Sequence, residues 1–150
     1  MDKSKQHIIK SIAQDLDCGF DCFYNIKTDE VVTVPNFKNI SDDELFDEAF
    51  GDIVQSLESN KADFIKIEVL ESFESFKIME RFVGQLSDLE LKGVLEDVLK
   101  NRKPFQNFKY VIENSACRQS WFDFKQNELE RIVEIQLKLN IAGDWQLTDF

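Results

Sequence analysis

The first third of the chain changes its pattern of hydrophobic and polar residues twice. Apolar residues recur at helical spacing over 8–16, and Gly19 follows at a position that suits the end of a helix. Apolar and polar residues then alternate over 20–26, and a turn-like segment at 27–30 leads into the β-branched residues 31–34. The pattern therefore predicts a helix followed by a β-hairpin.

The rest of the chain predicts one more strand and several helices. An apolar stripe predicts a helix over 41–59, and renewed alternation predicts a third strand over 64–69. Ser41 and Ser87 each precede a glutamate by three residues, which is the spacing of a capping box. Pro104 suits the first turn of a helix. After the third strand, helical spacing covers 73–86, 87–99, 104–112 and 121–139.

These elements define an α+β fold. We expect a small antiparallel three-stranded sheet in the N-terminal half, covered by helices, and a helical C-terminal half. No linker rich in Pro, Gly or Ser separates the halves, and the chain contains only two prolines. Residues 1–150 are therefore predicted to form a single domain, with the apolar stripes as its core.

Composition indicates a folded chain with an uneven charge. Hydrophobic residues make up 43% of the 150 residues and fourteen are Phe, which is enough for a core despite a net charge of −11. Residues 1–75 carry 7 Lys or Arg against 17 Asp or Glu, whereas residues 76–150 carry 11 against 12. A chain this acidic repels the phosphates of nucleic acids and anionic membranes, so nucleic acid is a poor default partner.

Neither a membrane span nor a secretory signal fits the pattern. The longest unbroken apolar run is three residues, Cys22–Tyr24, and the first residues lead into a charged amphipathic stretch. We therefore expect a cytoplasmic protein. The sequence does not decide whether the chain forms a homo-oligomer.

The scarcity of two residue types excludes the commonest catalytic machinery. His7 is the only histidine, and we expect it to be exposed, so a Ser–His triad or a His-ligated metal site would have to depend on that one imidazole. The five glycines are at least nine residues apart, which excludes Walker and dinucleotide-binding loops. Cys18, Cys22 and Cys117 are expected to be buried small hydrophobes, and metal or redox use is the lesser alternative. No cofactor is predicted.

Six acidic residues crowd the predicted helix over 41–59. Several are four residues apart and lie on neighbouring turns, where they can bind a divalent cation or a basic partner. The simpler interpretation is an acidic first turn favoured by the helix dipole, followed by a solvated face. A carboxylate-metal-dependent hydrolase is the alternative function that these acids keep open. They are Asp42, Asp43, Glu44, Asp47, Glu48 and Asp52.

A local basic cluster over 100–125 stands out in this acidic chain. Aromatic residues between cations suit an acidic peptide or a single-stranded nucleic acid, whereas cations near a helix end also suit the helix dipole. The candidate partner contacts are Arg102, Lys103, Lys109, Arg118 and Trp121. The same cluster includes Lys100, Phe105, Tyr110, Phe122 and Lys125.

Several segments carry motifs of a known family. The hairpin Tyr24–Val32, the middle segment Ile78–Phe82 and the later segments Phe105–Lys109 and Trp121–Phe124 resemble UPF0158, an uncharacterised bacterial family of small acidic proteins. Asp29 stands where the family usually has Gly, so we expect a left-handed residue there. The resemblance covers about residues 7–140. It implies a single α+β domain and brings no catalytic residues.

The leading functional hypothesis is therefore a non-enzymatic cytosolic binding or regulatory module with a protein partner. Its basis is a full core beside the absence of any complete catalytic set. The carboxylate-metal hydrolase, and nucleic-acid contact through the 100–125 cluster, are the alternatives.

Overall fold

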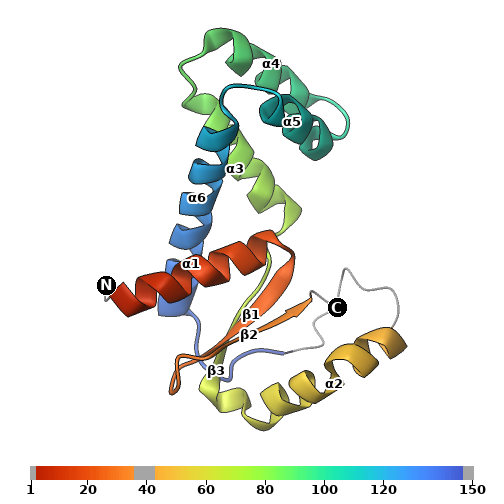
Figure 1. Cartoon of the computed structure of the whole chain (residues 1–150), viewed down its shortest axis with the longest axis vertical. Coiled ribbons are helices and arrows are strands. Elements are labelled where there is room, and N and C mark those ends of the chain that lie inside the picture. The colour runs from red at the N-terminus through yellow and green to blue at the C-terminus, as the bar shows by residue number, and fades with distance from the viewer. Residues whose placement is uncertain (1–2, 36–42, 147–150) are drawn as a thin grey trace. The chain divides into compact units, whose positions relative to one another are not determined.

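The computed structural model describes residues 3–35 and 43–146, with side chains over 5–35 and 48–146. The described elements confirm the predicted α+β fold, with the strands in the N-terminal half and mostly helices after them (Figure 1). Among the described helices, none is both long and apolar enough to cross a membrane. The elements are α1 (Lys3–Asp17), β1 (Phe20–Asn25), β2 (Val31–Pro35), α2 (Asp43–Ser59), the 3-10 helix η2 (Lys61–Asp63), β3 (Phe64–Ile67), α3 (Ser72–Gly84), α4 (Leu89–Lys100), α5 (Pro104–Glu113) and α6 (Arg118–Leu139).

The sheet has the order β2-β1-β3 and is antiparallel throughout. Its central strand β1 is buried on both faces, because successive side chains of a strand point to opposite sides. Cys22 is fully buried and its thiol donates to the carbonyl of Ile12 on α1 at 3.9 Å. Phe23, the next residue, packs in a cluster with Leu57 of α2. This confirms the prediction that helices cover the sheet and shows that they do so on both faces.

The turn of the β1–β2 hairpin is held by side chains as well as by the backbone. Asn25 Oδ1 accepts hydrogen bonds from the backbone N–H groups of Lys27 at 2.9 Å and Thr28 at 3.1 Å. Asp29 has a φ of +63°, which confirms the left-handed residue expected there. The hydroxyl of Tyr24 on β1 donates a hydrogen bond to the carboxylate of Asp29. This bond fixes the left-handed turn residue relative to the strand.

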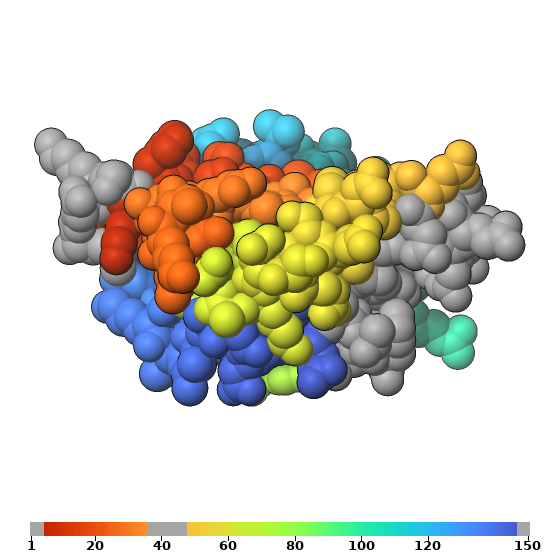
Figure 2. All heavy atoms as spheres, turned by 90° about the horizontal axis from the view of Figure 1, so that it is seen from below, coloured from red at the N-terminus to blue at the C-terminus, as the bar shows by residue number. Residues whose placement is uncertain are grey.

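The hairpin lies against the segment that precedes β3. Ile26 N–H donates to the carbonyl of Asp63 at 2.9 Å, and Lys27 Nζ forms an ion pair with the Asp63 carboxylate at 3.0 Å. Figure 2 shows this side of the molecule, with the hairpin in orange beside the yellow segment that contains η2. These contacts fix the start of β3 relative to β1.

The chain divides into two compact units. Unit 1 comprises residues 1–69 and 129–150, and unit 2 comprises residues 70–128. Unit 1 carries 9 Lys or Arg against 19 Asp or Glu, whereas unit 2 carries 9 against 10. The acidity of the sequence therefore belongs to unit 1. That both units form one domain stays a prediction.

Aromatic side chains from three helices form the core of unit 2. Phe82 of α3 packs edge-on against Trp121 of α6 at a centroid distance of 5.2 Å, and Phe108 of α5 packs against the same indole at 4.9 Å. Phe82 and Phe108 are at most 1% exposed. Leu95 of α4 is fully buried as well. The predicted apolar stripes of these helices thus do form a core.

Two helix starts differ from the sequence prediction. The N-cap of α4 is Asp88 and not Ser87, and the Asp88 carboxylate accepts from the Leu91 N–H at 3.1 Å. The prediction that Ser87 caps this helix was wrong because the neighbouring carboxylate, a stronger acceptor, takes the role. A capping box that the sequence analysis missed opens α3, with Glu71 as the N-cap and Glu74 as its partner. The predicted box of Ser41 lies outside the described residues.

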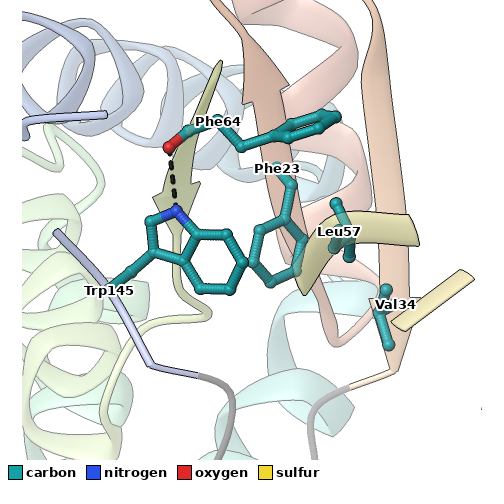
Figure 3. Packing of buried hydrophobic residues seen from close by; sticks show 5 residues of the cluster. All are labelled: Phe23, Val34, Leu57, Phe64 and Trp145. Carbon is teal, nitrogen blue, oxygen red and sulfur yellow. Dashed lines mark hydrogen bonds between the residues drawn. The ribbon is translucent and has the colours of Figure 1, made fainter. Parts of the chain in front are cut away.

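The sequence predicts no helix or strand after residue 139. In the structure, the segment that follows α6 completes the core of unit 1. It turns at Gly143, which has a φ of +82°, and brings Trp145 into the hydrophobic cluster. Trp145 Nε1 donates to the carbonyl of Phe64 at 2.8 Å, and its ring meets Phe23 at 4.9 Å (Figure 3). Val34 and Leu57 complete the cluster. Residues at the two ends of the sequence therefore share one core.

Candidate binding surface

The loop before α5 presents two of the predicted contact residues, Arg102 and Lys103. Lys103 is the N-cap of α5 and has a φ of +51°, an uncommon conformation for a residue with a side chain. Asn107 stabilises this loop, because its backbone N–H donates to the carbonyl of Lys103 and its side-chain amide donates to that of Arg102, each at 3.0 Å. Pro104 follows at the first helical position, as predicted. The loop geometry is therefore built by local hydrogen bonds.

The helix α5 has one face in the core and one face in solvent. Phe108 and Ile112 are buried, whereas Lys109 is exposed. Phe105 is 43% exposed and lies one turn before Lys109, and Tyr110 is 71% exposed on the adjacent row. We name Arg102, Lys103, Phe105, Lys109 and Tyr110 the α5 surface. It combines three cations with two exposed aromatic rings.

The cations of the α5 surface lack ion pairs within the described part of the chain. Arg102, Lys103 and Lys109 have no carboxylate partner there, and neither does the nearby Lys100. Elsewhere in unit 2, Arg81 is paired with Glu128 at 2.6 Å. Five cations and a single acid, Glu113, lie within residues 98–122. Cations therefore outnumber acids in this stretch of the sequence, and the cations of the α5 surface form no ion pair with described residues.

The remaining predicted contacts, Arg118 and Trp121, lie on the first turns of α6. Arg118 is exposed, and its guanidinium lies over the ring of Phe122 at 4.8 Å. Lys125 Nζ lies 5.7 Å from the centre of the Trp121 ring. Trp121 itself is only 7% exposed because it packs beneath α5. Its contact with a partner stays a prediction, whereas Phe105 and Tyr110 are exposed aromatic side chains of this region.

Sequence analysis missed an exposed aromatic side chain on α3. Phe73 was assigned to a core stripe but is 62% exposed, so that assignment was wrong. Its ring lies under Lys77 Nζ at 5.8 Å, and Phe76, one turn further, packs edge-on against Phe105 at 6.3 Å. The exposure of Phe73 could have been predicted from its place in the first turn of the helix, where fewer neighbours can cover a side chain.

The acidic residues of α2 supply no assembled metal site in what the structure describes. Glu48 and Asp52 are exposed. Asp42 and the side chains of Asp43, Glu44 and Asp47 lie outside the described residues. Among the side chains that are described, no group of three or more His, Cys, Asp or Glu residues could hold a metal ion.

The three cysteines differ in exposure. Cys22 is buried as predicted, and burial, with the nearby charges of Asp15 and Asp21, raises the pKa of its thiol to about 12. It is therefore protonated at neutral pH and is a poor nucleophile. Cys117 is half-buried, whereas Cys18 is exposed, so the prediction of burial was wrong for Cys18. It follows the last turn of α1, where the helix ends at the surface. His7 is exposed, as predicted.

The fold and this surface define an α+β protein with a basic and aromatic helix face in unit 2 and an excess of acidic residues in unit 1. The chain belongs to the uncharacterised protein family UPF0158, whose model matches residues 5–141. This confirms the resemblance found from the sequence motifs. No curated protein and no solved structure matches the chain.

Proposed function

We propose that this protein is a non-enzymatic, cytoplasmic binding module, and that the α5 surface binds an acidic segment of a partner protein. The observation that carries the proposal is the set of exposed cations without ion pairs beside two exposed aromatic rings. Arg and Tyr are enriched among the residues that dominate binding energy at protein interfaces. Unpaired cations lose no existing ion pair when a carboxylate approaches.

A protein partner fits the charge distribution better than a nucleic acid does. The chain has a net charge of −11, and unit 1 carries nearly all of it. A nucleic acid presents a long row of phosphates that this field repels, and its affinity falls steeply with salt. A short acidic segment needs to contact only the local surface around α5. Contact with single-stranded nucleic acid is therefore the alternative outcome of the test.

The proposal is tested with an acidic peptide and two charge-reversal variants. The probe is a fluorescein-labelled peptide in which pairs of glutamates alternate with leucine or tyrosine. We expect saturable binding to the wild-type chain and at least a tenfold loss for the triple variant R102E, K103E and K109E. The control variant, K5E with K27E and K138E, makes the same change in net charge at exposed positions of unit 1. Because Lys27 and Lys138 give up ion pairs with Asp63 and Glu134, circular dichroism melting of both triple variants checks that they are folded.

Three results would contradict the proposal. The first is a flat titration of the wild-type chain with the acidic peptide at low salt. The second is an equal loss of binding in both triple variants, because the effect would then come from net charge alone. The third is tighter binding of an oligothymidine strand of equal charge, which would favour the nucleic-acid alternative.

A further inference from the structure

The helix α2 of unit 1 complements the α5 surface in charge. It contains six acidic residues and no Lys or Arg. Glu48 and Asp52 lie one helical turn apart, and both are exposed. Neither forms an ion pair with a described residue. The helix therefore presents unpaired carboxylates, whereas the α5 surface presents unpaired cations.

A row of apolar side chains lies beside these carboxylates. Ala49 and Ile53 directly follow Glu48 and Asp52 in the sequence, and Ala49 is exposed while Ile53 is 38% exposed. We name Glu48, Ala49, Asp52 and Ile53 the α2 face. Figure 2 shows this end of α2 in gold at the surface of the molecule. The α2 face thus offers aliphatic contacts to the two exposed rings of the α5 surface, as well as carboxylates to its cations.

The core side of α2 leaves the α2 face free for a partner. Phe50, Val54 and Leu57 pack in the hydrophobic cluster of unit 1. Glu48 and Asp52 lie on the other side of the helix, because these positions are about half a turn away from Val54 at 100° per residue. The packing of unit 1 therefore does not use the two carboxylates.

The division of charge between the units permits this contact between two copies of the chain. Unit 1 carries 9 cations and 19 acids, a net charge of −10, and unit 2 carries 9 and 10, a net charge of −1. Two copies of unit 1 repel each other, but unit 2 of one copy approaches unit 1 of another as a nearly neutral body. Physiological salt screens the remaining repulsion over about 8 Å. Opposite charges in direct contact then orient the two surfaces.

We propose that the α5 surface of one copy binds the α2 face of a second copy. This inference rests on the function proposed above, and it identifies the acidic segment as part of α2 of another copy of this chain. The contact joins two different surfaces, so it closes into a ring or continues from copy to copy. One helix face against another is a small interface, so the association is weak and depends on concentration.

The test measures the mass of the full-length chain by sedimentation over a range of concentrations. We expect the mass of the wild-type chain to rise with concentration. Association is expected to be at least tenfold weaker in the variant R102E, K103E and K109E and in the variant E48K and D52K. The second variant separates the contact from net charge. Its two reversals change the net charge from −11 to −7, so an effect of net charge alone would strengthen the association.

A mixture of the two variants is the decisive control. The first variant keeps the acidic α2 face, and the second keeps the basic α5 surface, so opposite charges meet again only between unlike chains. We expect the mixture to associate more strongly than either variant alone, which also shows that both variants are folded. The control variant K5E with K27E and K138E has the same net charge as the first variant and is expected to associate more strongly than it does.

Three results would overturn the inference. They are a wild-type chain that stays monomeric at every concentration, a variant E48K and D52K that associates as strongly as the wild-type chain, and a mixture that associates no better than its components. If the acidic peptide binds the α5 surface while the wild-type chain stays monomeric, this inference fails and the proposed function stands. If the peptide does not bind either, both fail.

Discussion

Unit 1 and unit 2 each contain 9 Lys and Arg residues, yet unit 1 carries 19 Asp and Glu and unit 2 carries 10. In unit 1, described cations such as Lys27 and Lys138 form ion pairs with Asp63 and Glu134. In unit 2, the cations around α5 have no such partner among the described residues. The comparison shows that a strongly acidic chain can hold a locally basic surface when the excess of acids over cations lies in another unit.

The units also differ in how an aromatic residue is placed. Trp121 of unit 2 lies near the start of α6 and is buried by neighbouring helices. Trp145 of unit 1 comes from the segment after the last helix and is fixed by a hydrogen bond to Phe64. Unit 1 therefore depends on residues distant in sequence, whereas the core of unit 2 is built from one continuous stretch.

The largest expected effect is the loss of either tryptophan from its core. Trp121→Ala and Trp145→Ala are each expected to lower the free energy of unfolding by about 3–5 kcal/mol, because each removes a nearly buried aromatic ring. Denaturant titration followed by circular dichroism measures this. If Trp145→Ala lowers the free energy of unfolding by less than about 1 kcal/mol while Trp121→Ala shows the full loss, the segment after α6 is not part of the unit 1 core.

Single-tryptophan variants sharpen the same comparison. In Trp145→Phe the fluorescence reports unit 2 through Trp121, and in Trp121→Phe it reports unit 1 through Trp145. If residues 1–150 form a single domain, fluorescence and circular dichroism give one common midpoint within each variant. Two separate midpoints within one variant would contradict the single-domain prediction.

A smaller and opposite pair of effects is expected for two glycines. Gly143→Ala in unit 1 is expected to destabilise by about 1–3 kcal/mol, because the residue has a φ of +82° and its Cβ would crowd Ala62. Gly93→Ala in α4 of unit 2 is expected to stabilise by about 0.5–1 kcal/mol, since no atom lies within 4 Å of its Cβ. Thermal melting measures both changes in stability. Two changes of the same sign would contradict this expectation.

The hairpin of unit 1 gives the smallest effect and a specific pH dependence. Burial and the hydrogen bond to Asp29 raise the pKa of Tyr24 to about 12 from an ordinary value near 10. The protonated hydroxyl therefore contributes stability below about pH 10 that is lost as the pH rises through about 12. Tyr24→Phe is expected to destabilise by roughly 0.5–1.5 kcal/mol at neutral pH.

Phenolate absorbance checks the assignment. Tyr24→Phe is expected to remove the titration step near pH 12, whereas Tyr110→Phe, which changes an exposed residue of unit 2, leaves that step in place. Persistence of the step in Tyr24→Phe would contradict the assignment.

Most of the fold could be predicted because its elements are marked locally. The hairpin, the Pro104 helix start and most of the apolar stripes depend on neighbours within a few residues, and the structure confirms them. Phe73, Val94 and Leu139 are exposed exceptions in the stripes. The place of Trp145 could not be predicted, because its partners Phe23 and Phe64 lie far away in the sequence. The prediction of the N-cap of α4 failed for a different reason. Ser87 and Asp88 are adjacent, and either residue can cap a helix.

The candidate surface was predicted in part. The sequence shows that Arg102, Lys103 and Lys109 are neighbours of aromatic residues, but periodicity does not tell which ring faces solvent. The burial of Trp121 and the exposure of Phe73 depend on how the helices of unit 2 pack. That these cations form no ion pair with described residues also follows only from the packed structure, because unpaired and paired cations look alike in a sequence.

The most direct test of the central claim is a map of the backbone amide signals of the labelled full-length chain during titration with the acidic peptide. We expect the shift changes to concentrate in residues 100–113, which contain the cations of the α5 surface and both of its exposed rings. Shift changes that concentrate in unit 1, or spread evenly over both units, would contradict the claim that the α5 surface is the binding site.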